Sequence, residues 1–154
     1  MNRILDAQLM AERLESLKAG IIGALSLGFA FIVTSFVNTL VLAKYFSLFA
    51  TLLIEPLTLH FLLSGAIACF SGLLFGVTYR YIIRKDNNPH LNTGGVFAFG
   101  LVRGLTQIEV GGNITVSLLP YLVLALESIL WFAIAAIALD AAIKLGWLKP
   151  FSSN

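Results

Sequence analysis

The run "AGIIGALSLGFAFIVTSFVNTLVLA", residues 19–43, contains no charged residue. A helix of this length rises about 37 Å, which exceeds the roughly 30 Å hydrocarbon core of a bilayer. The whole chain has the same character, with 58% hydrophobic and 12% charged residues, whereas soluble domains have roughly 45 to 50% and about 25%. A soluble fold of 154 residues cannot bury that much apolar surface. We therefore expect an all-α polytopic membrane protein with a single helical membrane domain.

The apolar runs predict four transmembrane helices. Lys44 ends the first run, and Glu55 with Pro56 interrupts the next apolar stretch, because proline disfavours helical geometry at the residue before it. The stretch from Tyr45 to Ile54 is too short to cross alone, so we expect an interfacial or re-entrant segment there. The third span is short and would need support from its neighbours or local thinning of the bilayer. The spans are predicted at residues 19–43, 57–83, 95–110 and 117–144.

The two ends of the chain lie outside these predicted spans. Residues 1–18 place their apolar side chains on one helical face, with Glu12 and Glu15 on the opposite face, which predicts an amphipathic helix. Its acidic and basic residues nearly cancel, so it would lie at the interface or against a partner rather than grip anionic lipid. The alternative is a helical extension of the first span. The tail "GWLKPFSSN" is polar and predicted to be loose.

The basic residues predict the orientation of the chain, since they collect in cytoplasmic loops. With four spans, one side of the membrane keeps only Lys44. Both termini are therefore expected to face the cytoplasm or, in an organelle, the stroma. The basic residues on that side are Arg3, Arg13, Lys18, Arg80, Arg84, Lys85, Lys144 and Lys149.

Several classes of function are disfavoured by composition. The basic residues are scattered at span ends and form no stripe for nucleic acid. Cys69 is the only cysteine, so neither a disulfide framework nor a cysteine metal site is expected. No nucleophile with a base, no metal-ligand cluster and no phosphate-binding loop can be recognised. We expect no catalytic residue, no metal and no enzyme activity, although a bound pigment or lipid stays open.

Small residues recur at four-residue intervals on three of the predicted spans. Such ladders let helix backbones approach closely, and in lipid this close packing drives association. The partner helix is either another span of this chain or another protein, including a second copy. The ladder positions are Gly20, Ala24, Gly28, Ser64, Ala68, Gly72, Gly76, Gly100 and Gly104.

The third and fourth predicted spans each carry a charge near the middle of the bilayer. Arg103 would lie about 12 Å deep from one side and Glu127 about 15 Å deep from the other, so the two levels nearly coincide. An unpaired charge at this depth costs at least about 2.5 kcal/mol on insertion scales. We therefore predict that Arg103 pairs with Glu127 inside the bundle, with Gln107 one turn from Arg103. Alternatives are snorkelling of Arg103 to the headgroups or a salt bridge to another subunit.

His60 is the one candidate ligand for a pigment. It lies near one end of the second predicted span, while His90 lies in the loop on the opposite side. The two histidines therefore cannot share a haem or a metal within one chain. A solvated or hydrogen-bonded histidine is the alternative for His60, and a single axial ligand for a pigment magnesium is the functional one.

The segment "YRYIIRKDNNPHLNTGGVFAFGLVRGLTQIEVG", residues 79–111, resembles uncharacterised small integral membrane proteins of cyanobacteria and plastids. The resemblance covers about a fifth of the chain. It implies a thylakoid or plasma membrane setting and a role beside photosynthetic complexes. It supplies no catalytic residues.

These features favour a non-catalytic accessory, assembly or structural subunit of a larger membrane complex. The small-residue ladders, the small extramembrane mass and the missing catalytic constellation all point that way. The alternative is a small oligomeric transporter or channel that uses Arg103 and Glu127. Lipid and other membrane proteins are the expected partners in either case.

Overall fold

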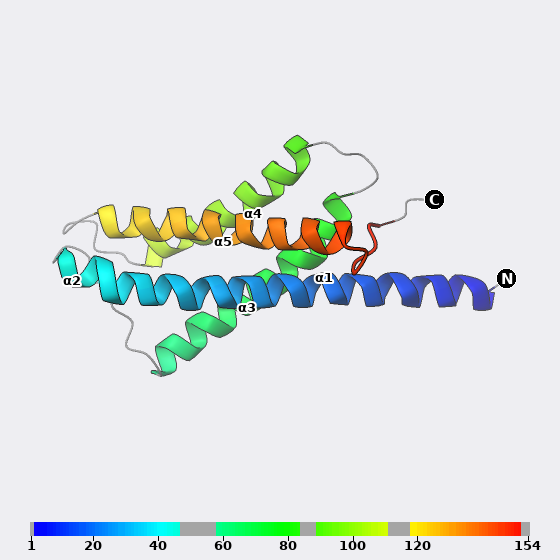
Figure 1. The fold of residues 1–154 in the computed structure, drawn as a ribbon, viewed down its shortest axis with the longest axis horizontal. Coiled ribbons are helices and arrows are strands. Elements are labelled where there is room, and N and C mark those ends of the chain that lie inside the picture. The colour runs from blue at the N-terminus through cyan, green and yellow to red at the C-terminus, as the bar shows by residue number, and fades with distance from the viewer. Residues whose placement is uncertain (1, 47–57, 84–88, 111–117, 152–154) are drawn as a thin grey trace.

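The computed structural model describes residues 2–46, 58–83, 89–110 and 118–151, and these residues form four long helices and no strand. The elements are α1 (Asn2–Val37), the π-helix η1 (Asn38–Leu42), α2 (Ala43–Tyr45), α3 (Leu59–Ile82), α4 (Pro89–Val110) and α5 (Leu119–Lys144). The N-terminal end of α1 and the C-terminal end of α5 lie at the same end of the bundle (Figure 1). We call this the terminal end, and the other end the cavity end.

The helices form two crossed pairs. α1 packs against α3, α4 packs against α5, and the pairs meet mainly through α1 and α5. α1 and α5 run antiparallel along the long axis, whereas α3 and α4 cross them obliquely (Figure 1). The direct contact between α3 and α4 is limited. This arrangement leaves space between the pairs at the cavity end.

Three helices in the described part of the chain are long and apolar enough to cross a membrane: Gln8–Tyr45, α3 and α5. This indicates an integral membrane protein. α4 differs from the prediction, because it begins at Pro89 rather than near residue 95 and is 22 residues long. It has the length but is not among the three apolar helices, since its sequence includes Asn92, Arg103 and Gln107. Of the four predicted spans, three therefore have the length and hydropathy expected of a transmembrane helix.

The predicted amphipathic helix and first span are one continuous helix. α1 runs unbroken for 36 residues from Asn2 to Val37, which corresponds to about 54 Å and exceeds the bilayer core. The last part of the predicted span, from Asn38, is instead the π-helix η1 followed by α2. Of the predicted interfacial segment, Tyr45 lies in α2, and residues 47–54 lie outside the described residues.

The other two boundaries follow from local chemistry. α3 begins at Leu59 because the Thr58 side chain accepts a hydrogen bond from the Phe61 amide at 3.2 Å, an N-cap. α5 carries Pro120 in its first turn, where a missing amide hydrogen costs no helical bond. Both helices lie within the ranges predicted for the second and fourth spans.

Small residues make the close contacts within both pairs. A side chain on Gly72 or Gly76 would collide with the α1 backbone, and one on Gly23 would collide with α3. In the second pair, a Cβ on Gly100 would lie 2.7 Å from Ile129 Cα, and one on Gly104 would lie 2.8 Å from Ala125 Cα. Both contacts are closer than side chains tolerate, so these helices approach because the residues are glycine.

The predicted ladder positions therefore face other helices of this chain. Gly20 and Gly28 lie against Val77 and Cys69 of α3, and Ala24 lies against Gly72. Ala68 is fully buried. Ser64 differs, since it lines a cavity between the helix pairs. Gly23 contacts α3 as closely as any of them and is absent from the predicted ladder, because the four-residue spacing counted from Gly20 passes over it.

Candidate functional site

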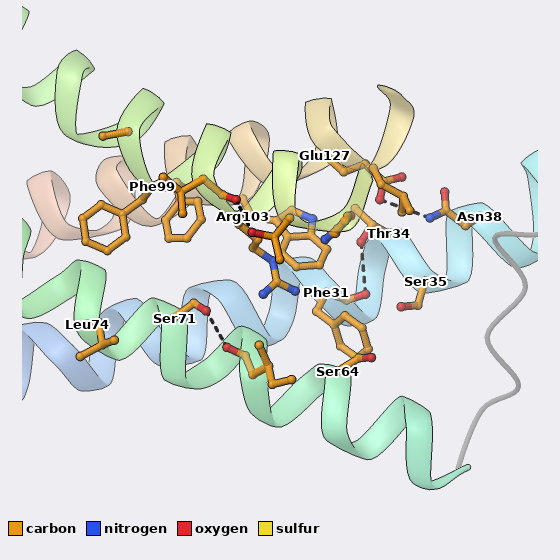
Figure 2. A pocket seen from close by; sticks show the side chains of 18 of the residues that line it. Phe31, Thr34, Ser35, Asn38, Ser64, Ser71, Leu74, Phe99, Arg103 and Glu127 are labelled. Carbon is orange, nitrogen blue, oxygen red and sulfur yellow. Dashed lines mark hydrogen bonds between the residues drawn. The ribbon is translucent and has the colours of Figure 1, made fainter. Parts of the chain in front are cut away.

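A cavity of about 840 Å³ lies between the two helix pairs at the cavity end (Figure 2). Side chains from α1, η1, α3, α4 and α5 line it. Its volume is in the range of small-molecule binding sites. The cavity exists because α3 and α4 diverge where their partners α1 and α5 stay together.

Most of the lining is apolar or aromatic. Phe31 packs on Phe61 with ring centroids 5.0 Å apart, and its edge meets Trp131 at 5.9 Å. Phe99 and Phe132, with centroids 5.6 Å apart, form a second aromatic group on the cavity wall. These rings are buried against one another, so they give the cavity a fixed apolar wall.

Hydroxyl groups on the wall are mostly committed to their own helices. Thr34 Oγ1 donates to the Ala30 carbonyl at 3.0 Å, Ser71 Oγ to Ile67 at 2.7 Å and Thr106 Oγ1 to Val102 at 2.8 Å. This back-bonding uses the hydroxyl hydrogen within the helix. The hydroxyls can accept hydrogen bonds from a bound molecule, but the donors must come from other residues.

Arg103 is the main donor on the cavity wall. It comes from α4, and Figure 2 shows its side chain reaching into the space between the helices. Its Cζ lies 4.9 Å from the centroid of the Trp131 ring, a cation–π contact. Arg103 Nε and Trp131 Nε1 are both buried without a hydrogen-bond partner. Two neighbouring donors in an apolar wall are thus left unused within the described residues.

Glu127 lies on the same wall but forms no ion pair with Arg103. Its Oε2 accepts a hydrogen bond from Asn38 Nδ2 at 3.2 Å, and Asn38 and Glu127 face each other in Figure 2. The ion pairs found among the described residues do not include Arg103 or Glu127. The predicted ion pair is therefore not formed. Arg103 and Glu127 line the same cavity, but Arg103 contacts Trp131 and Glu127 contacts Asn38.

The reason is that the two side chains reach different levels of the bundle, which the depth of their backbone positions does not give. The Arg103 guanidinium sits at the level of Trp131, which is four residues or about 6 Å of helix rise beyond Glu127. The Glu127 carboxylate instead points to the end of α1, where η1 begins with Asn38. The two charged groups are therefore separated by about one helical turn.

Gln107 on α4 contacts α5 at Ser128. Its Nε2 lies 3.5 Å from Ser128 Oγ, at the limit of a hydrogen bond, and Ser128 adjoins Glu127 in α5. Gln107 Oε1 and Asn38 Oδ1 are buried without a donor. Among the described residues, the cavity wall thus has unused donors at Arg103 and Trp131 and unused acceptors at Asn38, beside Glu127, and at Gln107.

His60 also lines the cavity, and its side chain is exposed. No group of three His, Cys, Asp or Glu residues that could hold a metal occurs among the residues the structure describes. Glu55, the nearest acid in sequence, lies outside them. A pigment ligand at His60 stays a prediction.

A second charged cluster, at the terminal end, was not predicted. Arg80 is only 1% exposed, and its guanidinium makes four hydrogen bonds. Nε donates to the Lys149 carbonyl at 2.9 Å, and Nη1 donates to the Glu12 carbonyl at 3.0 Å and to Ser16 Oγ at 2.7 Å. Nη2 forms an ion pair with the Glu12 carboxylate. We call Arg80, Glu12, Ser16 and Lys149 the Arg80 cluster.

The C-terminal tail packs against this cluster and is not loose in its described part. Leu148 is 1% exposed. The Lys149 amide donates to Glu15 Oε2 at 3.0 Å. The Phe151 ring packs at a tilt against the Tyr81 ring, with centroids 4.9 Å apart, and its centroid lies 5.7 Å from Arg80 Cζ. Gly146 has φ of 74°, the left-handed conformation that lets the chain turn back after α5.

Comparison with known proteins identifies no relative: no family model, no curated protein and no solved structure matches the chain. The resemblance of residues 79–111 to cyanobacterial and plastid membrane proteins therefore stays a prediction.

Proposed function

We propose that this protein binds an amphipathic anion in the cavity between its helix pairs and carries it within or across the membrane. All four long helices lie in the bilayer in this proposal, with both termini on the cytoplasmic or stromal side. The single observation that carries the proposal is Arg103. It is a guanidinium on the wall of a cavity of about 840 Å³ and has no acidic partner in the described chain.

The chemistry of Arg103 supports an anionic group. An arginine within a membrane span is costly unless it is paired. Its planar set of N–H donors matches carboxylate, sulfonate or phosphate oxygens. The nearby Trp131 Nε1 offers one more unused donor. A bound anion would pair with the guanidinium.

The rest of the wall supports an apolar body on that anion. Phe31, Phe99 and Phe132 line the cavity beside the charged groups. A mostly apolar pocket with a few placed polar groups is typical of ligand sites. The class of ligand is therefore an acidic head on a hydrocarbon or aromatic body. Its source is either a bilayer lipid or a free amphiphile.

The arrangement of two polar residues supports the proposal that α4 also spans the membrane. Gly100 and Gly104 hold α4 against α5, while Arg103 and Gln107 line the cavity. Arg103 and Gln107 therefore face the inside of the bundle. Polar residues within spans are tolerated where they face such an interior.

The binding test uses Trp131 as a built-in reporter. Trp131 is 5% exposed and lines the cavity, whereas Trp147 is 71% exposed, so Trp147→Phe leaves one tryptophan at the site. In nanodiscs of neutral lipid, a bromine-bearing alkyl sulfonate should quench Trp131 with saturation. The matching bromoalkyl alcohol, which lacks the charge, should quench it weakly.

Variants and competitors separate the sources of this signal. Arg103→Gln should weaken sulfonate binding by about 10- to 100-fold, the range for a hydrogen bond to a charged group. Lys144→Gln removes an exposed positive charge at the terminal end and should leave binding unchanged. Anionic phospholipid that displaces the sulfonate would identify a lipid ligand. Equal quenching by sulfonate and alcohol would refute the proposal.

A subunit role in a larger membrane complex is the second candidate, and the N-terminal part of α1 favours it. α1 extends beyond the rest of the bundle at the terminal end (Figure 1), and the N-terminal half of α1 has Leu9, Met10, Leu14 and Leu17 exposed. The small-residue ladders no longer argue for this role, because their glycines contact helices of the same chain. Co-purification of a stoichiometric membrane partner in mild detergent, lost on Leu14→Ser, would favour this candidate.

A further inference from the structure

Glu127 is a carboxylate that has only a neutral partner in the described structure. Asn38 Nδ2 donates to its Oε2 at 3.2 Å, and no ion pair involves it. The titratable groups that line the cavity are His60 on α3, Arg103 on α4 and Glu127 itself on α5. α1 and η1 contribute Phe31, Thr34, Ser35 and Asn38, none of which is ionisable.

The unused hydrogen-bonding groups of the cavity wall are divided into two sets. Around Arg103 the unpartnered atoms are donors, Arg103 Nε and Trp131 Nε1. Beside Glu127 the unpartnered atom is an acceptor, Asn38 Oδ1, and Gln107 Oε1 on α4 is a further buried acceptor of the wall. An anion beside the guanidinium complements the positive charge of the first set. The second set needs a donor, and a carboxylic acid hydrogen on Glu127 would supply one.

The net charge of the cavity also favours a proton on Glu127 when an anion is bound. With Glu127 ionised and His60 neutral, the groups that line the cavity sum to zero, because Arg103 offsets Glu127. A bound anion adds a negative charge beside Glu127 in surroundings of low dielectric, where like charges repel strongly. Adding a proton to Glu127 restores neutrality. Anion binding and protonation therefore favour each other, and linkage makes this reciprocal.

We propose that Glu127 is a proton-binding site of the cavity, which takes up one proton from water as an anion binds at Arg103. The new O–H bond forms on a Glu127 carboxylate oxygen, and nothing is oxidised or reduced. Anion and proton then occupy the cavity together without net charge. This inference rests on the proposed function, since it concerns the same cavity and the same ligand.

Asn38 is suited to both protonation states of Glu127. Its Nδ2 donates to the carboxylate, while its Oδ1 has no donor. Rotation of the amide by half a turn would present Oδ1 to a carboxylic acid hydrogen instead. Asn38 is 5% exposed and is the first residue of the π-helix η1, a local geometry found frequently at functional sites. We assign Asn38 a positioning role for the Glu127 proton.

The first test measures sulfonate binding against pH, because a sulfonate stays ionised and only protein groups titrate. Binding that takes up one proton weakens by about tenfold for each unit of rising pH, once the free carboxylate is ionised. Wild type should show this slope above neutral pH. Glu127→Gln, which mimics the protonated form, should bind with the low-pH affinity at every pH. His60→Gln should retain the wild-type slope.

The second test does not depend on any variant being well folded. A pH-indicating dye in weakly buffered nanodisc solution would count the protons taken up when the sulfonate binds wild-type protein. One proton per bound sulfonate is expected near the pH where the slope appears, and none for Glu127→Gln. Asn38→Ala should shift the pH at which the slope appears while the number of protons stays one.

The outcomes distinguish the two proposals. Saturable binding that depends on Arg103 but takes up no proton at any pH would overturn the role of Glu127 and leave the proposed function standing. A slope abolished by His60→Gln and retained in Glu127→Gln would transfer the proton site to His60. Absence of specific sulfonate binding to wild type would overturn both proposals together.

Discussion

Each end of this bundle holds an arginine, and the two arginines differ in how fully they are hydrogen-bonded. Arg80 at the terminal end is 1% exposed, and its guanidinium makes four hydrogen bonds, including one to a carboxylate. Arg103 at the cavity end contacts an aromatic ring, and its Nε has no hydrogen-bond partner. The first guanidinium is fully used in the fold. In the proposed function, the Arg103 guanidinium binds the anion.

The surroundings of each arginine explain the difference. At the terminal end, α1, α3 and the tail after α5 converge, so backbone carbonyls and Glu12 surround the side chain. At the cavity end, α3 and α4 diverge and leave a cavity. Since groups that move or bind are drawn from the less constrained parts of a fold, the terminal end is expected to stay fixed while the cavity end responds to ligand.

Replacing Arg80 should have the largest effect on stability. Arg80→Met keeps much of the volume but leaves the Lys149 and Glu12 carbonyls and the Glu12 carboxylate without their donor. Breaking a buried ion pair by removing one partner costs about 3 to 5 kcal/mol, and the lower end is expected because the Glu12 side chain is 32% exposed. Thermal unfolding in detergent should show a correspondingly large loss. Arg13→Met, at an exposed position beside Glu12, should change the unfolding little, and equal losses in both variants would contradict the role of Arg80.

The tail should make a smaller contribution at the same end. Leu148→Ala removes a side chain that is 1% exposed, and such truncations cost about 2 to 5 kcal/mol. Because the tail can detach locally, the lower part of that range is expected. Hydrogen exchange should show faster exchange of the Lys149 amide, which is bonded to Glu15. Leu145→Ala, at a position that is 65% exposed, is the control, and unchanged exchange in Leu148→Ala would show that the tail is held by other contacts.

Periodic and uniform features of the fold could be predicted from sequence. Uninterrupted hydropathy located α3 and α5, and the small-residue spacing located the glycines that face neighbouring helices. The start of α4 could not be located in this way, because its first turn, from Pro89, is polar. The continuity of α1 is equally hard to predict, because charge near residue 12 does not stop a helix that extends beyond the bilayer.

The candidate site could be predicted only in part. The predicted depths of Arg103 and Glu127 along their spans are similar, and the structure shows both residues lining one cavity. Their actual neighbours depend on how each helix is rotated and on the π-helix η1, which follows α1 and begins at Asn38. The Arg80 cluster joins positions 12, 80 and 149. Such distant contacts have no local signal in a single sequence.

Replacing Arg103 should affect stability less than replacing either Arg80 or Leu148. Arg103→Met loses the cation–π contact with Trp131, worth about 0.5 to 2 kcal/mol. It also removes an unpaired charge from an apolar region, which is favourable by a similar or larger amount. The two terms oppose each other, so unfolding in detergent should move by about 1 kcal/mol or less, in either direction. A loss as large as that of Arg80→Met would mean that Arg103 holds the fold together, and the contrast between the two ends would then fail.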